Sequence, residues 1–170
     1  MGDYMKFCSK RLFFIRLILV LLTLSVVIFI FSNSAQNAQN SSAASGRVTD
    51  FLNNICLMFH LNFTFTQDVV RTLAHFSEFG LLGVVSLLTA LSFFDVKVKS
   101  LITSILFSAV VSVADECIQL FSDGRAFQFS DLIIDFSGLS SGIVSVFLIA
   151  LLINYHRIKV QRRNNNGKDN

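Results

Sequence analysis

The sequence predicts an all-α polytopic membrane protein, a bundle of four transmembrane helices, and three observations lead to that prediction. Only 15% of the 170 residues are charged, whereas soluble domains have about 25%. The mean hydropathy is +0.64, which is too apolar for a disordered chain. Four apolar stretches can cross a bilayer core, which takes about 20 residues, although the middle two reach that length only by including charged residues. So few charges would not cover a water-exposed surface, and the length fits one domain.

The four expected spans lie at about 12–32, 70–93, 98–121 and 132–155. The first is read as an uncleaved anchor helix, because its apolar stretch exceeds a signal-peptide core and no small-x-small cleavage site follows. We expect one membrane domain over 1–156 and a polar, basic cytoplasmic tail over 157–170, lying in solvent or against anionic headgroups. The chain has no proline, so no span has a proline kink.

The basic residues are distributed very unevenly between the two sides of the predicted bundle. Only Arg47, Arg71 and Arg125 of the 14 lysines and arginines fall on one side. The others precede or begin the first span, lie between spans two and three, or follow span four. Cytoplasmic loops are rich in lysine and arginine. We therefore predict a multi-pass plasma-membrane protein with both termini cytoplasmic and the 33–70 and 122–130 loops outside.

The first outer loop changes character along its length. Residues 32–46 (SNSAQNAQNSSAASG) are small and polar, which predicts a flexible segment unable to form a core. After them, apolar residues recur at spacings of three and four, which predicts an amphipathic helix. These residues are Val48, Phe51, Leu52, Ile55 and Phe59. Such a helix either lies flat on the outer membrane interface or packs against the bundle, and the sequence does not choose between the two.

Five of the 11 acidic residues fall in or at the edges of the predicted spans: Glu78, Asp115, Glu116, Asp131 and Asp135. Ionisable groups inside a bilayer are costly, and they normally face a protein interior or a water-filled cavity. With a rise of about 1.5 Å per residue, the acids of all three spans lie roughly 6–10 Å inward from the outer end. The sequence therefore predicts a polar pocket, open to the outer face and lined by spans two to four.

Helical spacing groups the polar residues into stripes. In span two, Arg71, His75 and Glu78 share a face, and in span four Asp131 and Asp135 share one. The full set expected to bind a ligand is Arg71, His75, Glu78, Asp115, Glu116, Gln119, Arg125, Asp131 and Asp135. The arginines would pair with acids or bind an anionic ligand, and His75 would exchange a proton. The competing interpretation is a structural network in which the cations only neutralise the carboxylates.

The stripe of span four continues into Gly138 and Gly142. Glycines four residues apart allow two membrane helices to approach closely. We expect this pair to bring span four against a neighbouring helix.

Four sequence blocks combine in a recognisable order. They are FSNS at 31–34, RTLAHFSEFG at 71–80, DECIQ at 115–119 and DGRAFQFSD at 123–131, the last leading to Gly138. Over about residues 31 to 142 the chain resembles the VanZ-like membrane proteins of bacteria. That resemblance implies a role in lowered susceptibility to teicoplanin, a lipoglycopeptide antibiotic, or elsewhere in cell-envelope physiology, without naming a reaction. The ligand would be a lipoglycopeptide or a lipid-linked envelope precursor, alongside membrane lipid.

Two other function classes stay open. An intramembrane hydrolase or transferase on a lipid-linked or peptide substrate would use His75, Glu78, Asp115 and Glu116 as catalytic residues. The same four residues are of types that hold a divalent metal, although we expect no metal and no cofactor. A proton-coupled carrier is less favoured, because the acids cluster in the outer half and the inner parts of spans two and three read as purely apolar. The net charge of +3 is too small to indicate a nucleic-acid partner, and the oligomeric state is open.

Overall fold

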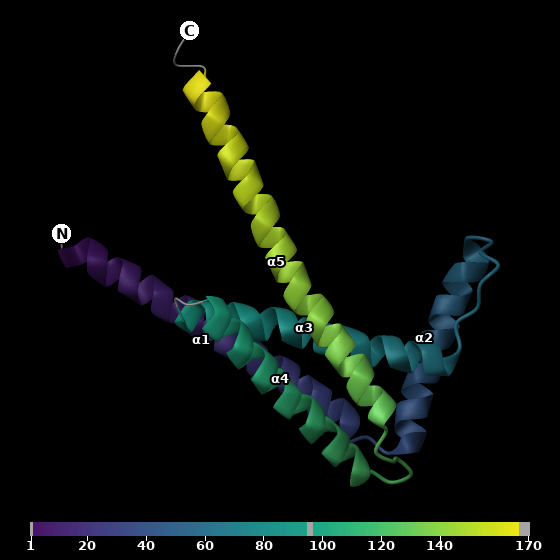
Figure 1. Ribbon diagram of the computed structural model, residues 1–170. Helices are drawn as coiled ribbons and strands as arrows, with labels where there is room; N and C mark the ends of the chain where they lie inside the picture. The colour runs from purple at the N-terminus through teal and green to yellow at the C-terminus, as the bar shows by residue number, and fades with distance from the viewer. Residues whose placement is uncertain (1, 95–96, 167–170) are drawn as a thin grey trace.

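The computed structural model describes residues 2–94 and 97–166, and all secondary structure in those ranges is helical. The helices, in chain order, are α1 (Gly2–Ser34), α2 (Ala38–Met58), α3 (Gln67–Phe93), α4 (Lys97–Leu120) and α5 (Phe129–Asn166) (Figure 1). Four of them contain apolar stretches that are long enough to cross a membrane. These stretches are Lys10–Ser34, Gln67–Phe93, Lys97–Leu120 and Phe129–Ile153. The predicted all-α bundle of four spans is confirmed, and α2 is the additional helix.

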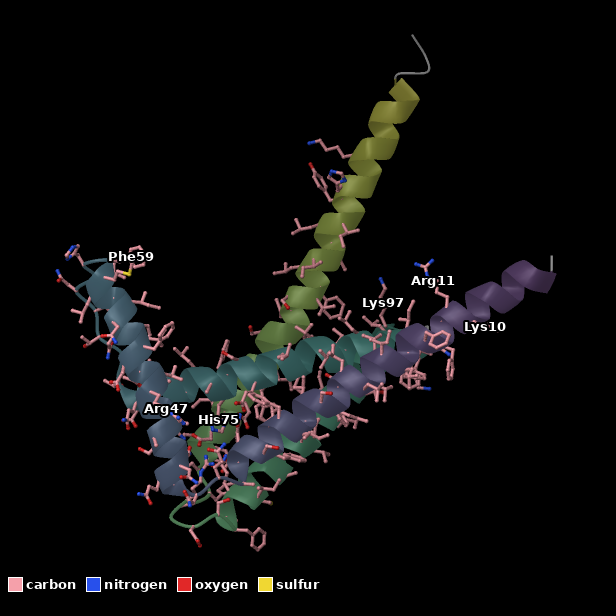
Figure 2. All side chains as sticks on the ribbon, turned by 180° about the vertical axis from the view of Figure 1, so that it is seen from behind. Lys10, Arg11, Arg47, Phe59, His75 and Lys97 are labelled. Atoms are coloured by element: carbon pink, nitrogen blue, oxygen red, sulfur yellow. The ribbon has the colours of Figure 1, made fainter. Side chains whose placement is uncertain are left out.

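The four spans alternate in direction, so the connections fall at two ends of the bundle. The start of α1 lies towards the end that carries the connection between α3 and α4, and α5 runs away from the opposite end of the bundle (Figure 1). We call the other end, which carries α2 and the 121–128 connection, the α2 end. Lys10, Arg11 and Lys97 lie far from α2, whereas Arg47 and His75 lie at the α2 end (Figure 2). The prediction that the α2 end faces outside stays a prediction.

The structure does not describe the side chains of several basic residues that predict the membrane orientation. The side chains of Lys6, Arg157, Arg162 and Arg163, and all of Lys168, lie outside the described residues, as does the side chain of Cys8. The backbone of α5 continues as helix to Asn166, well beyond the predicted span boundary near 155. Neither proline nor glycine interrupts 155–166, and arginine, lysine and glutamine are good helix formers.

Helix α3 is the central element, since it contacts α1, α2, α4 and α5. Its closest approach is to α5. A Cβ atom added to Gly142 would overlap the carbonyl oxygen of Gly80, and one added to Gly138 would overlap that of Phe76. The two backbones therefore touch where α5 crosses α3, as small residues permit in membrane helices. Past this crossing, α5 diverges from the other spans (Figure 1).

Helix α2 begins at Ala38, inside the segment that the sequence analysis treats as flexible. The prediction of a flexible polar segment is therefore wrong for residues 38–46. The Asn37 side chain caps the helix by accepting a hydrogen bond of 2.9 Å from the Asn40 amide. The Ala38 amide donates to the carbonyl oxygen of Asp123 at 3.0 Å, which ties the start of α2 to the 121–128 connection. The cap and this contact therefore hold residues 38–46 in a helix, although their small, polar composition does not predict one.

The rest of α2 packs on the bundle and also exposes apolar side chains. Asn53 accepts a hydrogen bond from the Phe65 amide at 2.7 Å and donates to the Phe65 carbonyl at 3.1 Å. Thr49 and Cys56 are buried. Large apolar side chains nevertheless remain exposed towards the end of α2, namely Phe51, Leu57, Met58 and Phe59. Helix α2 thus contacts α3 and also keeps an apolar face that suits a membrane interface. Both predicted placements stay predictions.

The interior away from the α2 end contains buried hydroxyl groups among apolar side chains. The Ser86 hydroxyl is hydrogen-bonded to that of Ser104 at 2.7 Å and to that of Ser108 at 3.3 Å. Thr23 and Thr89 form a similar pair at 2.9 Å between α1 and α3. The expectation that the inner parts of spans two and three are purely apolar is therefore wrong, because small hydroxyls fill the helix contacts there.

Candidate functional site

The predicted polar residues lie at the α2 end, on three helices and one connection. Helix α3 supplies Arg71, His75 and Glu78, α4 supplies Asp115, Glu116 and Gln119, and α5 supplies Asp131 and Asp135. Four of these side chains are fully buried, namely Asp115, Glu116, Gln119 and Asp135. In this small bundle they take interior positions that apolar side chains usually occupy.

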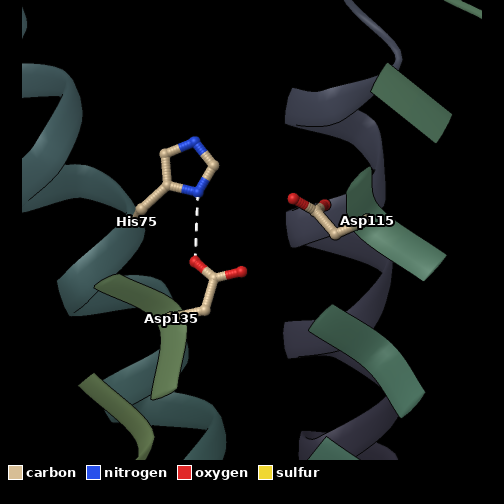
Figure 3. A group of neighbouring side chains, drawn as sticks. All are labelled: His75, Asp115 and Asp135. Carbon is tan, nitrogen blue, oxygen red and sulfur yellow. Dashed lines mark hydrogen bonds and ion pairs between the residues drawn. The ribbon is translucent and has the colours of Figure 1, made fainter. Parts of the chain in front are cut away.

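Two ion pairs join α3 to α5. Arg71 Nη2 lies 3.2 Å from Asp131 Oδ2, and His75 Nδ1 lies 3.3 Å from Asp135 Oδ1 (Figure 3). Arg71 and His75 are four residues apart on α3, and their partners are four residues apart on α5. The second pair therefore lies about one helical turn from the first, on the same faces of the two helices. The equal spacing sets the register of the two helices at the α2 end.

Asp115 faces the second of these pairs from α4. Its carboxylate accepts hydrogen bonds from the Ser34 hydroxyl and from Gln119 Nε2 at 3.0 Å. The Ser112 hydroxyl donates to Asp135 Oδ2 at 2.7 Å. Figure 3 shows His75, Asp115 and Asp135 directed towards a common space between three helices. Metal-ligating atoms from these three residues all lie within 4.8 Å of one another.

The two glutamates are held apart from that group. Asn33 Nδ2 donates to Glu78 Oε1 at 2.8 Å, and the Gln128 amide donates to Glu116 Oε2 at 2.9 Å. Within the described residues, the buried atoms Glu116 Oε1 and Gln119 Oε1 have no hydrogen-bond partner. The residues whose ligand atoms converge are therefore His75, Asp115 and Asp135, rather than the two glutamates predicted beside His75 and Asp115.

Arg125 reaches the site from the 121–128 connection. Gly124 has a φ of 74°, a left-handed conformation that favours glycine, and it turns the chain just before Arg125. Arg125 Nη1 then donates to the carbonyl oxygens of Asn33 at 3.3 Å and Ser34 at 3.2 Å. Burial and then the nearby positive charge of Arg71 lower the pKa of the Arg125 guanidinium. The connection thus holds a second arginine close to Arg71.

A cavity of about 380 Å³ lies where α2 crosses α3. Its polar wall is formed by Arg71, His75, Glu78 and Arg125, together with Asn33 and Ser34 at the end of α1. Its apolar wall includes Val48, Leu52, Val70 and Leu73 from α2 and α3. A second cavity of about 230 Å³ shares Ser41, Ser45 and both arginines with the first.

The position of the cavity differs from the sequence prediction. Spans two to four were expected to line it, yet the lining residues come from α1, α2, α3, Gln36 and Arg125, and none comes from α4 or α5. Helices α3 and α5 touch through Gly80 and Gly142, so the interior between them is closed. Asp115 and Asp135 lie behind Ser34 and His75, which line the cavity and contact them.

The model of the VanZ/LLP1 family matches residues 18–154, which is most of the chain. The chain belongs to this family. No curated protein and no solved structure matches it. As a VanZ/LLP1 protein with four apolar helices, it is a multi-pass membrane protein.

Sequence reasoning missed several groups that complete the site of this VanZ/LLP1 protein. Asn33 and Ser34 contact Glu78 and Asp115, and both lie in the FSNS block that the family resemblance had already marked. Ser112 lies three residues before Asp115 on α4, so its position facing α5 follows from helical spacing. The small cavity residues of α2, Ser41, Ala44 and Ser45, had no usable signal because they lie in the segment predicted to be flexible. Val48 and Leu52 were predicted on an amphipathic helix, but nothing in the sequence placed them at the cavity.

Proposed function

We propose that this VanZ/LLP1 protein binds an anionic amphiphile of the outer leaflet of the bacterial plasma membrane and so lowers susceptibility to teicoplanin-type lipoglycopeptides. The amphiphile is either the lipoglycopeptide or a lipid-linked envelope precursor. One observation supports this most strongly: Arg71 and Arg125 line the same cavity as the apolar wall of α2 and α3. Positive charge beside an apolar wall matches a molecule with an anionic group and a hydrocarbon part.

The arginines keep hydrogen-bonding capacity for such a ligand. A guanidinium carries five N–H donors. In the described chain, Arg71 has one ion pair, to Asp131, and Arg125 Nε is buried without a partner. Remaining donors directed at phosphate or carboxylate oxygens would form strong charge-assisted hydrogen bonds.

The size and position of the cavity fit part of an amphiphile. Small-molecule sites usually measure about 300–1,000 Å³, and this cavity is near the lower limit. It therefore suits a headgroup or a segment of an acyl chain, with the rest of the ligand outside. The exposed apolar side chains of α2, such as Phe51, Met58 and Phe59, would hold its mouth at the membrane interface.

The test is expression in a susceptible host, with teicoplanin and vancomycin sensitivity measured in parallel. We expect reduced sensitivity to teicoplanin. Protection against teicoplanin alone would identify the lipoglycopeptide as the ligand, and protection against both drugs would identify the lipid-linked precursor. No change in either, with the protein confirmed in the membrane, would refute the proposal.

A matched pair of variants ties any protection to the cavity. Arg125→Gln removes a guanidinium from the polar wall, and we expect protection to be largely lost. Arg47→Gln removes an exposed arginine of α2 that does not line the cavity, and we expect protection to persist. Equal effects of the two changes would mean that only overall charge matters.

A second candidate function is favoured by the His75–Asp135 hydrogen bond. A carboxylate that holds one ring nitrogen leaves the other to act as a general base, and His75 lines the cavity. The protein would then hydrolyse or transfer a group on a lipid-linked or peptide substrate. Turnover of such a substrate by purified protein, abolished in Asp135→Asn, would establish this function; no turnover with an intact, folded protein would count against it.

A further inference from the structure

We propose that His75, Asp115 and Asp135 form a binding site for a first-row divalent metal ion, best suited to Zn²⁺, behind the wall of the cavity. The three residues come from α3, α4 and α5, and their ligand atoms lie within 4.8 Å of one another (Figure 3). The site does not depend on the identity of the amphiphile, so it can be tested separately from the proposed function.

The separations between the three ligand atoms are close to those of a tetrahedral metal site, and small side-chain movements would complete it. Zn²⁺ bonds to nitrogen and oxygen of about 2.0–2.2 Å place neighbouring tetrahedral ligands roughly 3.4 Å apart. His75 Nδ1 and Asp135 Oδ1 already lie 3.3 Å apart. An approach of at most about 1.4 Å by Asp115 would bring the third ligand to the same spacing. One imidazole and two carboxylates suit a first-row transition metal better than Ca²⁺ or Mg²⁺, which prefer oxygen ligands alone.

The charges around the three residues give an independent reason for a cation. Arg71 is engaged by Asp131, and Arg125 contacts backbone carbonyls. Among the described residues, His75 is the one cation in direct contact with the fully buried Asp135, and Asp115 is hydrogen-bonded only to neutral groups. Arg125 acts on Asp115 at longer range, so two buried carboxylates face one contacting cation. Burying carboxylates without matching positive charge is costly. A divalent ion bound by a neutral His75 would balance both.

The atoms next to the three residues also fit this assignment. Ser34 and Gln119 donate to Asp115, and Ser112 donates to Asp135. Hydrogen bonds of this kind orient the ligands of metal sites. In addition, the buried oxygen Gln119 Oε1, on a side chain that contacts Asp115, has no partner in the described chain. A metal ion or its bound water would provide one.

The site has a connection to the cavity. His75 and Ser34 both line the cavity, and Ser34 is hydrogen-bonded to Asp115. With three protein ligands, a tetrahedral ion keeps one open position for water or for an oxygen of a ligand. The ion would enter from the cavity, between His75 and Ser34.

The experiment is Zn²⁺ binding to tag-free, full-length protein in detergent micelles, with bound metal measured after gel filtration. We expect about one Zn²⁺ per chain, and affinity lowered roughly tenfold or more in Asp115→Asn and in Asp135→Asn. Asp50→Asn, which changes an exposed acid of α2 that lines neither cavity, should bind Zn²⁺ as the unaltered protein does. Zn²⁺ should also raise the melting temperature of the unaltered protein by more than that of Asp135→Asn.

Two results would overturn the site. One is the absence of bound Zn²⁺ at 100-fold excess in protein that elutes as a single folded species. The other is equal Zn²⁺ affinity in the unaltered protein and both aspartate variants, which would place the metal elsewhere, for example on Cys56 or Cys117, the free cysteines of the described chain. Because these measurements need no amphiphile, their failure leaves the proposed function standing, and the failure of the susceptibility assay leaves the metal site standing.

Discussion

The two ends of the bundle interior solve the problem of packing membrane helices in different ways. At the α2 end, the contacts among α3, α4 and α5 are ionic, with Asp115, Asp135 and His75 at their centre. At the other end, the contacts are hydroxyl pairs such as Ser86 with Ser104, among apolar side chains. Burying a hydroxyl or a glycine in a membrane interior costs little free energy, whereas burying a charged side chain costs much more.

This difference separates residues that hold the fold from residues that carry function. Replacing a buried ion pair with apolar residues is often neutral for stability or even stabilising, so the acids at the α2 end are poorly explained as supports of the fold. The glycine and hydroxyl contacts elsewhere provide close helix packing without charge. We therefore expect changes at the α2 end to abolish function and changes at the other contacts to affect stability.

The largest expected effect is on function. Asp115→Ala and Glu78→Ala should each abolish protection in the susceptible host, while both proteins still insert into the membrane. Asp115 holds Ser34 in the cavity wall, and Glu78 lines the cavity. Asp50→Ala, which removes an exposed acid of α2, is the matched control and should keep protection. Full activity in both variants would instead favour a purely structural network.

The next effect is on stability at the crossing of α3 and α5. Gly142→Leu forces a side chain against the Gly80 carbonyl and should lower the free energy of unfolding by about 1–3 kcal/mol. Gly46→Ala is the control, because its Cβ meets only the flexible end of Gln67. Unfolding in SDS-containing mixed micelles measures both. An unchanged midpoint for Gly142→Leu would show that the two helices separate more easily than the geometry indicates.

A smaller stability effect is expected at the arginine that bridges α3 and α5. The Arg71 side chain is 35% exposed, and partly exposed ion pairs contribute at most about 1 kcal/mol. Arg71→Gln should therefore change stability little and still reduce protection strongly, because a cavity donor is lost. If Arg71→Gln destabilised the protein by more than about 3 kcal/mol, as breaking a buried pair does, Arg71 would belong to the structural network.

The smallest effect is expected at the hydroxyl pairs. A double-mutant cycle on Ser86→Ala and Ser104→Ala should give a coupling energy of about 0.6 kcal/mol, the average for such contacts in membranes. Both single variants should retain protection. Loss of protection in either variant would show that residues away from the α2 end also contribute to function, against the proposed division between functional and structural contacts.

The sequence predicts the fold well because the bilayer constrains it strongly. Length and apolarity identify the four spans, and helical spacing places Arg71 with His75 and Asp131 with Asp135 on common faces. Those faces do meet, in two ion pairs one turn apart. Periodicity along one helix is therefore enough to find which polar residues point inward.

What the sequence does not predict is how neighbouring helices share the space. The cavity lies between α2 and α3, because α5 contacts α3 too closely to leave space between those two helices. That close contact depends on glycines of both α3 and α5. Likewise, α2 extends back to Ala38 because of a cap and a contact with Asp123. Both features are tertiary, and neither can be read from a single segment.

The central claim is that an anionic amphiphile occupies the cavity between α2 and α3. The most direct measurement is an experimental structure of the full chain in lipid nanodiscs with teicoplanin present. The account predicts density for a ligand in the cavity, with an anionic group within hydrogen-bonding distance of Arg71 or Arg125 and a hydrocarbon part against Val48 and Leu52. Bound ligand located elsewhere, with only water beside the two arginines, would contradict it.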